Sequence, residues 1–484
     1  MVDDPLNVDA HVLINLKDDL GVNSSSVIEV PYNVSTYQLS SIVHSLLSQN
    51  EDEICPYAFY VGEKEITKTL SSSIDLSQIN SEKALDVVYQ AQSVFKVRPV
   101  NRCSSSLEGH SEAIVSAQFS PTGSQLASGS GDATVRFWDL TTETPLFEGK
   151  GHANWVLALA WAPSGKRIAS GCKNGEVRIW DPFTGKQSGS TLKGHRQWIT
   201  SLAWEPLHFN GECRQIASAS KDTDIRIWDS WNCACIKVLS GHLQSVTCLV
   251  WSSEGFLISG GQDRTMKIWN SNDGTLRKTL SAHGHWVNTL ALNTAYIMRV
   301  GWFQPANASI NPSQTPNNPS ELCKQAGKLL NEFMHGRCEM LVSGSDDFTL
   351  MLWNLSSLSN SKPISRLLGH QATINDVKFS PDGRLIASAS FDKSVRLWNG
   401  STGQFVATLR GHVSRVYQVA WAADSRLLVS SSSDSTIKLW SVQKKKILMD
   451  LPGHADEVYA VDWSPDGQKV VSGGKDRILK IWRA

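Results

Sequence analysis

The sequence predicts a mainly β protein in which a small α+β domain precedes a closed ring of eight antiparallel sheets. Three observations support this prediction. A unit of roughly 42 residues, with Gly-His at its front and Trp near its end, recurs through most of the chain. The first 92 residues lack this repeat, and their apolar pattern switches between strand and helix periods. Acidic residues are concentrated in the same non-repeating part.

At the front of the chain, residues 1–92 have the strand and helix order of a ubiquitin-like β-grasp domain. Apolar alternation at 12–16 and the stretch SVIEV at 26–30 predict a hairpin. Ser35 and Gln38 form a capping box before a helix whose apolar residues fall on one face. Further strands are expected at 57–61, around Ile66 and at 85–89.

The repeats follow this domain, and four residue types recur at matching places in each. The histidines of the repeat fronts are His110, His152, His195, His242, His283, His370, His412 and His454. The tryptophans near the repeat ends are Trp138, Trp180, Trp228, Trp269, Trp353, Trp398, Trp440 and Trp482. An aspartate stands six residues before each tryptophan except in the second repeat, which has Asn174, and a serine stands four residues before that position in all eight. The fifth repeat has Ala282-His283 and then Gly284-His285, which leaves two registers open.

This pattern is typical of the WD40 repeat and predicts an eight-bladed WD40 β-propeller over 93–484. In each blade the four residues are expected to join in one buried hydrogen-bond network, which rigidifies the blade when every member has a partner. The first set is His110, Ser128, Asp132 and Trp138, and the last is His454, Ser472, Asp476 and Trp482. Ser, His and Asp also form catalytic triads, but eight copies favour a structural role. We therefore expect no enzymatic activity and no cofactor of the protein's own.

Two features modify the ring. Residues 93–100 (SVFKVRPV) are rich in β-forming residues and precede the first Gly-His, which predicts that they close the ring as the outer strand of the last blade. The fifth repeat carries an insertion at about 293–339, with a loop-like middle and a helical pattern at 319–335. An insertion of this length is more typical of a binding element, although a mobile loop stays open as the alternative.

Aromatic and basic residues recur near one face of the predicted ring. They occupy the third position after the repeat histidine and the position before the repeat acid, and exposed residues of these types form interface hot spots. The candidates for binding a protein or RNA partner are Trp155, Lys173, Trp198, Lys221, Trp286, Arg415 and Lys475. The alternative, that several of them pack between blades, stays open.

Composition bears on location and partners. Residues 1–92 contain 14 Asp and Glu against 4 Lys and Arg, a balance of −10, and the remainder carries +10. This asymmetry suits a protein that contacts two different surfaces and makes nucleic acid a candidate for one of them. The alternative, that solvated charges have drifted without a functional cause, stays open. The sequence has no apolar run long enough for a membrane span, its start lacks the features of a signal peptide, and its nine cysteines lack zinc-site spacing. We expect an intracellular protein without membrane contact.

Four phrases are distinctive: FKVRPVNRCSSSLEGH, ASGSGDATVRFWDLTTETP, VSGSDDFTLMLWN and LPGHADEVYAVDWSPDGQ. Together with the domain order, they closely resemble the Notchless family, and the resemblance covers essentially the whole chain. It implies a late assembly factor of the large (60S) ribosomal subunit, located in the nucleolus and nucleoplasm and acting as a monomer within a large particle. The propeller would dock on pre-60S ribosomal proteins, rRNA and other assembly factors. The first domain would be bound by the MIDAS domain of midasin, an AAA ATPase that remodels the particle and releases the factor.

The resemblance also implies a role for Glu82. The MIDAS domain of the partner holds Mg²⁺, a hard cation that takes a carboxylate oxygen as ligand. In the family this ligand is a glutamate before the last β-grasp strand, which corresponds to Glu82. Asp86 and the acidic cluster at 51–53 are the alternatives. Two other functions stay open at this stage, a substrate receptor of a ubiquitin ligase and a modulator of Notch signalling.

Overall fold

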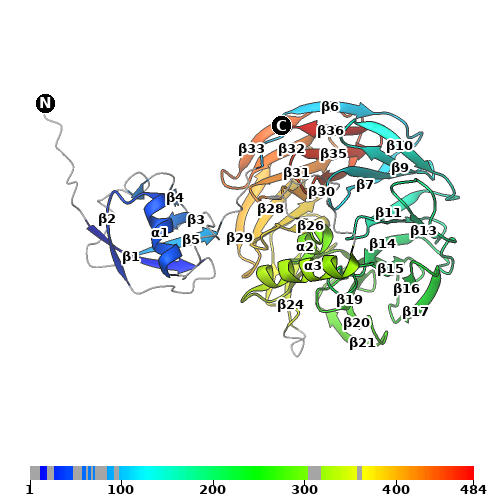
Figure 1. Cartoon of the computed structure of the whole chain (residues 1–484), viewed down its shortest axis with the longest axis horizontal. Helices are drawn as coiled ribbons and strands as arrows, with labels where there is room; N and C mark the ends of the chain where they lie inside the picture. Colours follow the sequence, from blue (N-terminus) through cyan, green and yellow to red (C-terminus); the bar gives the residue numbers. More distant parts are fainter. Residues whose placement is uncertain are drawn as a thin grey trace. The chain divides into compact units, whose positions relative to one another are not determined.

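The computed structural model describes residues 11–18, 27–46, 57–61, 64–66, 69–70, 84–91, 97–303, 318–356 and 362–484. The chain divides into two compact units, Met1–Lys96 and Val97–Ala484 (Figure 1). Among the described residues, every helix is too short or too polar to cross a lipid bilayer.

The first unit contains a five-stranded mixed sheet and one helix. The strands are β1 His11–Asp18, β2 Ile28–Pro31, β3 Tyr57–Val61, β4 Lys64–Ile66 and β5 Leu85–Ala91, and the helix is α1 Thr36–Leu46. The sheet order is β2-β1-β5-β3-β4, with β1 parallel to β5 and the other neighbours antiparallel. This is the ubiquitin-like β-grasp order that the sequence predicts.

Helix α1 starts at a capping box and packs on this sheet. The Ser35 N–H donates to the Gln38 side chain at 3.0 Å, and the Gln38 N–H donates to Ser35 Oγ at 3.3 Å. Two backbone donors at the helix start are thereby satisfied. Leu39 and Val43, one turn apart, are buried in one core with Phe59 of β3.

The second unit consists of eight antiparallel sheets, one for each repeat (Figure 1). Blades 1 to 3 contain β7 Ile114–Phe119, β8 Gln125–Ser130, β9 Val135–Asp139, β10 Thr144–Gly149; β11 Val156–Trp161, β12 Ile168–Cys172, β13 Val177–Trp180; and β14 Ile199–Trp204, β15 Gln215–Ser220, β16 Asp224–Asp229, β17 Ala234–Ser240. Blades 4 to 6 contain β18 Val246–Trp251, β19 Phe256–Gly261, β20 Thr265–Asn270, β21 Leu276–Ser281; β22 Val287–Leu292, β23 Met340–Ser345, β24 Leu350–Asn354, β25 Ser365–Leu367; and β26 Ile374–Phe379, β27 Leu385–Ser390, β28 Ser394–Asn399, β29 Phe405–Arg410. Blades 7 and 8 contain β30 Val416–Trp421, β31 Leu427–Ser432, β32 Ile437–Ser441, β33 Lys446–Leu451; and β34 Val458–Trp463, β35 Lys469–Gly474, β36 Leu479–Arg483, β6 Arg102–Leu107.

The first strand of each blade lies innermost, and these inner strands form a closed ring. Each contacts the inner strand of the next blade, and β34 of blade 8 contacts β7 of blade 1. The predicted eight-bladed propeller is thus confirmed. Blade 2 differs from the others, because its sheet has three strands. The isolated bridges Trp180↔Gln187 and Val177↔Leu192 and the backbone hydrogen bond from Ser188 to Ile179 at 2.8 Å lie along its outer edge.

The repeat residues form a buried network in every blade. The histidine Nε2 lies 2.6–2.8 Å from the serine Oγ, which also accepts the tryptophan Nε1–H at 2.7–3.1 Å. In seven blades the histidine Nδ1 lies 2.6–3.1 Å from the aspartate, and blade 2 has Asn174 there. In blade 5 these contacts are made by His283, which settles the register that the sequence leaves open.

The ring closes through β6, which pairs antiparallel with β36 as the outer strand of blade 8. The prediction that 93–100 form this strand is wrong, because the strand is Arg102–Leu107 and the described residues 97–100 are not in a strand. The apolar residues of 93–100 favoured that prediction. Outer strands of this propeller are largely exposed, and β6 is the polar sequence RCSSSL immediately before the first Gly-His. Val97 is instead buried, and its N–H donates to Asp424 Oδ2 at 2.9 Å.

The insertion of blade 5 occupies 293–339, between β22 and β23, and includes α2 Ala295–Val300 and α3 Pro319–Met334. It begins where β22 ends, so it lies on the face opposite to the Gly-His loops, which precede the inner strands. Arg299 of α2 pairs with Asp462 of blade 8, with Nη1 2.8 Å from Oδ1, and Cys323 of α3 donates to the His208 carbonyl of blade 3 at 2.9 Å. The described parts of the insertion therefore connect blades on different sides of the ring.

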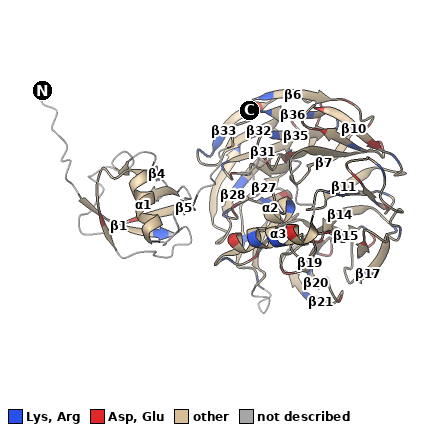
Figure 2. Ribbon diagram, viewed as in Figure 1, with Lys and Arg blue, Asp and Glu red and all other residues tan. Residues whose placement is uncertain are grey.

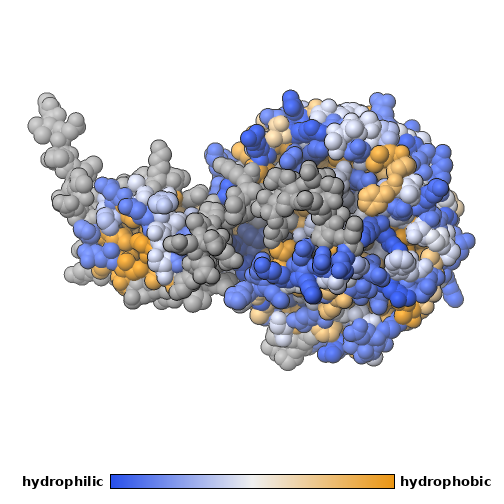
Figure 3. All heavy atoms as spheres, viewed as in Figure 1, coloured by the Kyte–Doolittle hydropathy of each residue, from blue (hydrophilic) through white to orange (hydrophobic). Residues whose placement is uncertain are grey.

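Helix α3 is amphipathic. It buries Leu322, Ala326 and Leu330 at successive turns and exposes charged residues on its other side. Figure 2 shows both signs of charge along the helix, and Figure 3 shows a hydrophilic surface over it. The exposed side of α3 thus has the composition of a solvated surface.

Candidate functional site

Two loops of each blade meet on one face of the ring, which we call the Gly-His face. In all eight blades the backbone N–H before the repeat Asp or Asn donates to the carbonyl of the third residue after the repeat histidine, at 2.8–3.0 Å. Each blade therefore places one pair of adjacent residues on this face, and in blade 1 one member of the pair is Gly131. Both positions that the sequence analysis singled out belong to these pairs.

Blades 2 and 3 present two such pairs that contact each other. Trp155 is paired with Lys173 and Trp198 with Lys221. The Lys173 Nζ lies 5.4 Å from the Trp155 ring centroid and 4.5 Å from that of Trp198, and the Lys221 Nζ lies 4.7 Å from the Trp198 centroid. The tryptophans remain 43% and 41% exposed, so these cation–π contacts leave part of each ring accessible. We call these four residues the Trp-Lys cluster.

The other three candidates on this face lie apart from the cluster. Trp286 of blade 5 is 41% exposed and its pair member is Asp346, so its surroundings are not basic. Arg415 of blade 7 has its guanidinium carbon 5.3 Å from the Phe391 ring centroid. Lys475 of blade 8 forms an ion pair with Asp456 at 3.2 Å. The structure therefore brings together four of the seven predicted residues.

An aromatic row across blades 6 to 8 was not predicted. The Phe391 and Tyr417 rings lie 5.8 Å apart, and the Tyr417 and Tyr459 rings lie 5.3 Å apart. Both tyrosine hydroxyls donate to Glu457 Oε2 at 3.0 Å. The two tyrosines are the fifth residues after their repeat histidines, so comparison of that position across the repeats could have found them.

Blade 2 departs from the network of the other seven. Asn174 is exposed, and its Oδ1 accepts a hydrogen bond from Asn154 Nδ2 at 3.0 Å. The Asn154 Oδ1 in turn accepts the backbone N–H of Trp155 at 2.8 Å. His152 is buried, and its Nδ1 has no hydrogen-bond partner among the described residues. The side chain that replaces the repeat aspartate is thus connected to Trp155 and not to the histidine.

The same blade has a group of possible metal ligands. The ligand atoms of His152, Cys172 and Glu176 lie within 4.8 Å of one another. Glu176 is already paired with Arg178 at 3.3 Å and with Lys193 at 3.4 Å. Burial raises the pKa of Cys172, which keeps the thiol protonated, and burial together with the Arg178 charge lowers the pKa of His152 to about 4. A metal ion would have to displace two cations and a proton, so we assign no metal to this group.

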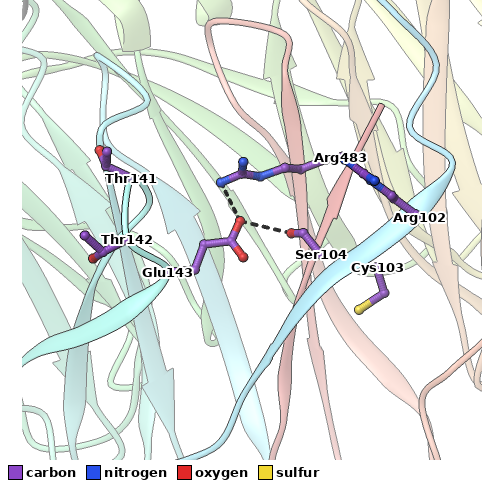
Figure 4. A pocket seen from close by; sticks show the side chains of 7 residues that line it. All are labelled: Arg102, Cys103, Ser104, Thr141, Thr142, Glu143 and Arg483. Carbon is purple, nitrogen blue, oxygen red and sulfur yellow. Dashed lines mark hydrogen bonds and ion pairs between the residues drawn. The ribbon is translucent and has the colours of Figure 1, made fainter.

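A depression of about 400 Å³ lies where the ring closes (Figure 4). Its lining comes from β6, the end of β36 and the turn 141–143 of blade 1. Glu143 accepts a hydrogen bond from Ser104 Oγ at 3.0 Å and forms an ion pair with Arg483 at 2.5 Å. These contacts join the closing strand, the end of the chain and blade 1, which indicates a structural role for the acidic side chain.

In the first unit, Glu82 and the acidic cluster at 51–53 lie outside the described residues. Asp86 lies on β5 and is exposed, and its carboxylate accepts hydrogen bonds from Lys17 at 2.6 Å and from Asn15 at 3.1 Å. The hydrogen bond from Lys17 is the largest influence and lowers the pKa of Asp86. This carboxylate is ionised, but it already has two partners within the domain.

Comparisons with known proteins agree with both units. Residues 12–74 match the model of the NLE (NUC135) domain. Seven stretches match the model of the WD domain, G-beta repeat: 101–139, 143–181, 186–229, 233–270, 361–399, 403–441 and 445–483. Blade 5, which the insertion interrupts, is a structural blade outside these stretches.

Several relatives match most of the chain. Protein Notchless of Drosophila melanogaster is 52% identical over 370 residues, covering 76% of this chain and 75% of the relative. Ribosome assembly protein 4 of Saccharomyces cerevisiae is 44% identical over 411 residues, covering 81% of this chain and 78% of the relative. Among solved structures, the computationally designed Ika8 protein matches with a TM-score of 0.60 and 27% identity, covering 78% of this chain and 98% of that one.

Proposed function

Because this chain belongs to the Notchless family, we propose that it is a non-enzymatic assembly factor of the large (60S) ribosomal subunit. The observation that carries the proposal is its 44% identity, over 81% of the chain, to a relative named Ribosome assembly protein 4. The hydrogen-bond network occurs in every blade, which supports a structural role for its Ser, His and Asp residues. We therefore propose that the ring acts by binding other molecules.

In this proposal the propeller docks on a precursor particle in the nucleolus and nucleoplasm, where it contacts rRNA, ribosomal proteins and other assembly factors. The Gly-His face supports such docking, because it exposes aromatic and basic side chains, the residue types enriched at interface hot spots. The basic balance of residues 93–484 favours an RNA-rich partner.

The first unit would bind the MIDAS domain of midasin through one carboxylate. That domain holds the Mg²⁺, and this chain would supply a carboxylate oxygen in trans from Glu82. The contacts of Asp86 with Lys17 and Asn15 favour Glu82 over Asp86, because a metal ion would have to displace both partners of Asp86. ATP-driven pulling on this unit would then remodel the particle and release the factor.

The proposed contact of the first unit can be tested by Mg²⁺-dependent binding of the full chain to the MIDAS domain of midasin. Glu82→Ala is expected to abolish binding, and Glu82→Asp to weaken it strongly, because aspartate is one methylene shorter. Asp86→Ala serves as the matched control and is expected to bind normally. Normal binding by both Glu82 variants would transfer the role to another carboxylate or another partner.

The function itself is tested by sedimentation of the tagged protein from nuclear extracts. It is expected to migrate with 60S precursors and to be retained on them when the midasin contact is removed. Copurification of ubiquitin-ligase subunits without ribosomal proteins would instead support a substrate receptor, and copurification of a Notch receptor would support a signalling role.

A further inference from the structure

Blade 2 lacks the hydrogen bonds of the repeat aspartate that every other blade has. In the other seven blades, the repeat aspartate accepts two hydrogen bonds. One comes from the repeat histidine, and the other comes from the backbone N–H of the residue that follows this histidine. In blade 2 the His152 Nδ1 is buried, and no residue that the structure describes forms a hydrogen bond with it. An unsatisfied buried polar group is costly, and departures of this kind concentrate at functional sites.

The side chain at this position instead orders the adjacent surface. Asn154 Nδ2 donates a hydrogen bond of 3.0 Å to Asn174 Oδ1. Asn154 Oδ1 in turn accepts a hydrogen bond of 2.8 Å from the backbone N–H of Trp155. Trp155 is one of the two exposed indoles of the Trp-Lys cluster. With asparagine in place of the repeat aspartate, His152 loses a hydrogen-bond partner, and the loop that carries the exposed Trp155 gains one.

The substitution also changes the local charge. The loops that carry the cluster contain Lys173, Arg196 and Lys221. Their acids are already paired, Asp222 with His195 at 2.9 Å and Glu176 with Arg178 and Lys193. An aspartate in place of Asn174 would add a carboxylate directly after Lys173 in the same loop. Its absence leaves a basic surface with two partly exposed aromatic rings, which is the combination that binds single-stranded nucleic acids.

We propose that the Trp-Lys cluster binds a short single-stranded RNA segment, with bases stacked on Trp155 and Trp198 and phosphates near Lys173 and Lys221, and that Asn174 is a positioning residue for Trp155. The inference rests on the proposed function, because it names the RNA contact of the face that docks on the particle. An acidic peptide would use the ammonium groups but would leave the flat indole faces without a matching partner. A nucleotide uses both features, because its base stacks on an indole face and its phosphate lies near an ammonium group. The observations therefore favour RNA.

The direct test is fluorescence anisotropy of the full-length protein with a labelled single-stranded oligouridylate. Trp155→Ala and Trp198→Ala are expected to weaken binding by roughly 5- to 100-fold each, since each removes a stacking surface. Lys173→Met and Lys221→Met are expected to weaken binding and to lower the slope of log affinity against log salt by about 0.7 each.

The positioning role is tested by Asn154→Ala and Asn174→Asp. Asn154→Ala removes the bridge without adding charge, so it should weaken RNA binding and leave the salt slope unchanged. Asn174→Asp should restore the network, raise the melting temperature by about 2 °C or more, and weaken RNA binding at the same time. Asp434→Asn, the converse change in blade 7, should lower the melting temperature and leave RNA binding unaltered.

Two results would overturn the inference. Unchanged RNA affinity in both tryptophan variants would remove the cluster as the RNA site, and binding of an oligoglutamate peptide in preference to RNA would assign it to an acidic protein segment. Weak binding by the tryptophan variants with normal binding by Asn154→Ala and Asn174→Asp would refute the positioning role. Sedimentation with 60S precursors is measured separately, so failure of the RNA test and failure of the proposed function give different results.

Discussion

At the residue scale, the serine is the shared member of each blade network. In blade 8, Ser472 Oγ lies 2.7 Å from His454 Nε2 and accepts the Trp482 Nε1–H at 2.9 Å. Ser472→Ala leaves two buried polar groups without partners and is expected to lower the free energy of unfolding by about 3 kcal/mol. Ser401→Ala, in an exposed turn, is the matched control and should change it by less than about 0.5 kcal/mol. Urea denaturation measures both, and equal midpoints would show that the network contributes little.

The buried His152 predicts a pH dependence. Burial and Arg178 lower its pKa from 6.5 to about 4, so the folded state keeps it neutral where the unfolded chain binds a proton. Its contribution to stability is therefore fully present above pH 6.5 and is lost as the pH falls from 6.5 to about 4. Melting temperatures across this window should fall less steeply for Asn174→Asp, because the new carboxylate favours the protonated histidine. Parallel curves for the two proteins would refute this account.

At the element scale, the closing strand β6 is a non-local contact, since it joins the front of the propeller to its last strand. Deletion of residues 1–96 should leave the propeller folded, because β6 and the buried Val97 remain. Deletion of residues 1–107 removes β6 and exposes the edge of β36, so this fragment should melt at lower temperature and aggregate. Thermal denaturation with light scattering compares the two fragments. Equal behaviour would mean that blade 8 does not need its outer strand.

The glycine of the Gly-His pair lies against an arginine side chain from another strand of the repeat. At Gly151, φ is +149° and a Cβ atom would lie 2.4 Å from Arg178 Nη1. Gly369 has φ +148° and the same relation to Arg396. The arginine two residues before the tryptophan therefore packs over the glycine, and a Cβ atom there would displace the guanidinium group. The sequence displays both residues at fixed spacing, but only the fold brings them into contact.

At the scale of the whole molecule, the repeat spacing was enough to predict the number of blades and most members of the networks, because both are local and occur eight times. The histidine of blade 5 was the exception, since the sequence left two registers open there. Three features depend on contacts between distant segments and could not be predicted. The closing strand is too polar to be recognised, the insertion reaches Asp462 through Arg299, and the Trp-Lys cluster requires that blades 2 and 3 be adjacent. Asn174 was visible as an exception, but its hydrogen bond to Asn154 was not.

The charge asymmetry leads to a prediction about the two units together. Residues 1–92 carry −10 and the remainder +10, so the first unit should repel the same polyanion that the ring attracts. Deletion of residues 1–96 is expected to raise the affinity of the propeller for oligouridylate severalfold at low salt. The difference should vanish near physiological salt, where the Debye length is about 8 Å and charges on separate units no longer interact. Anisotropy titrations of the full chain and the fragment over a salt series measure this. Equal affinities at low salt would show that the acidic unit stays too far from the RNA site to act on it, and a difference that persists at high salt would indicate direct contact instead of long-range repulsion.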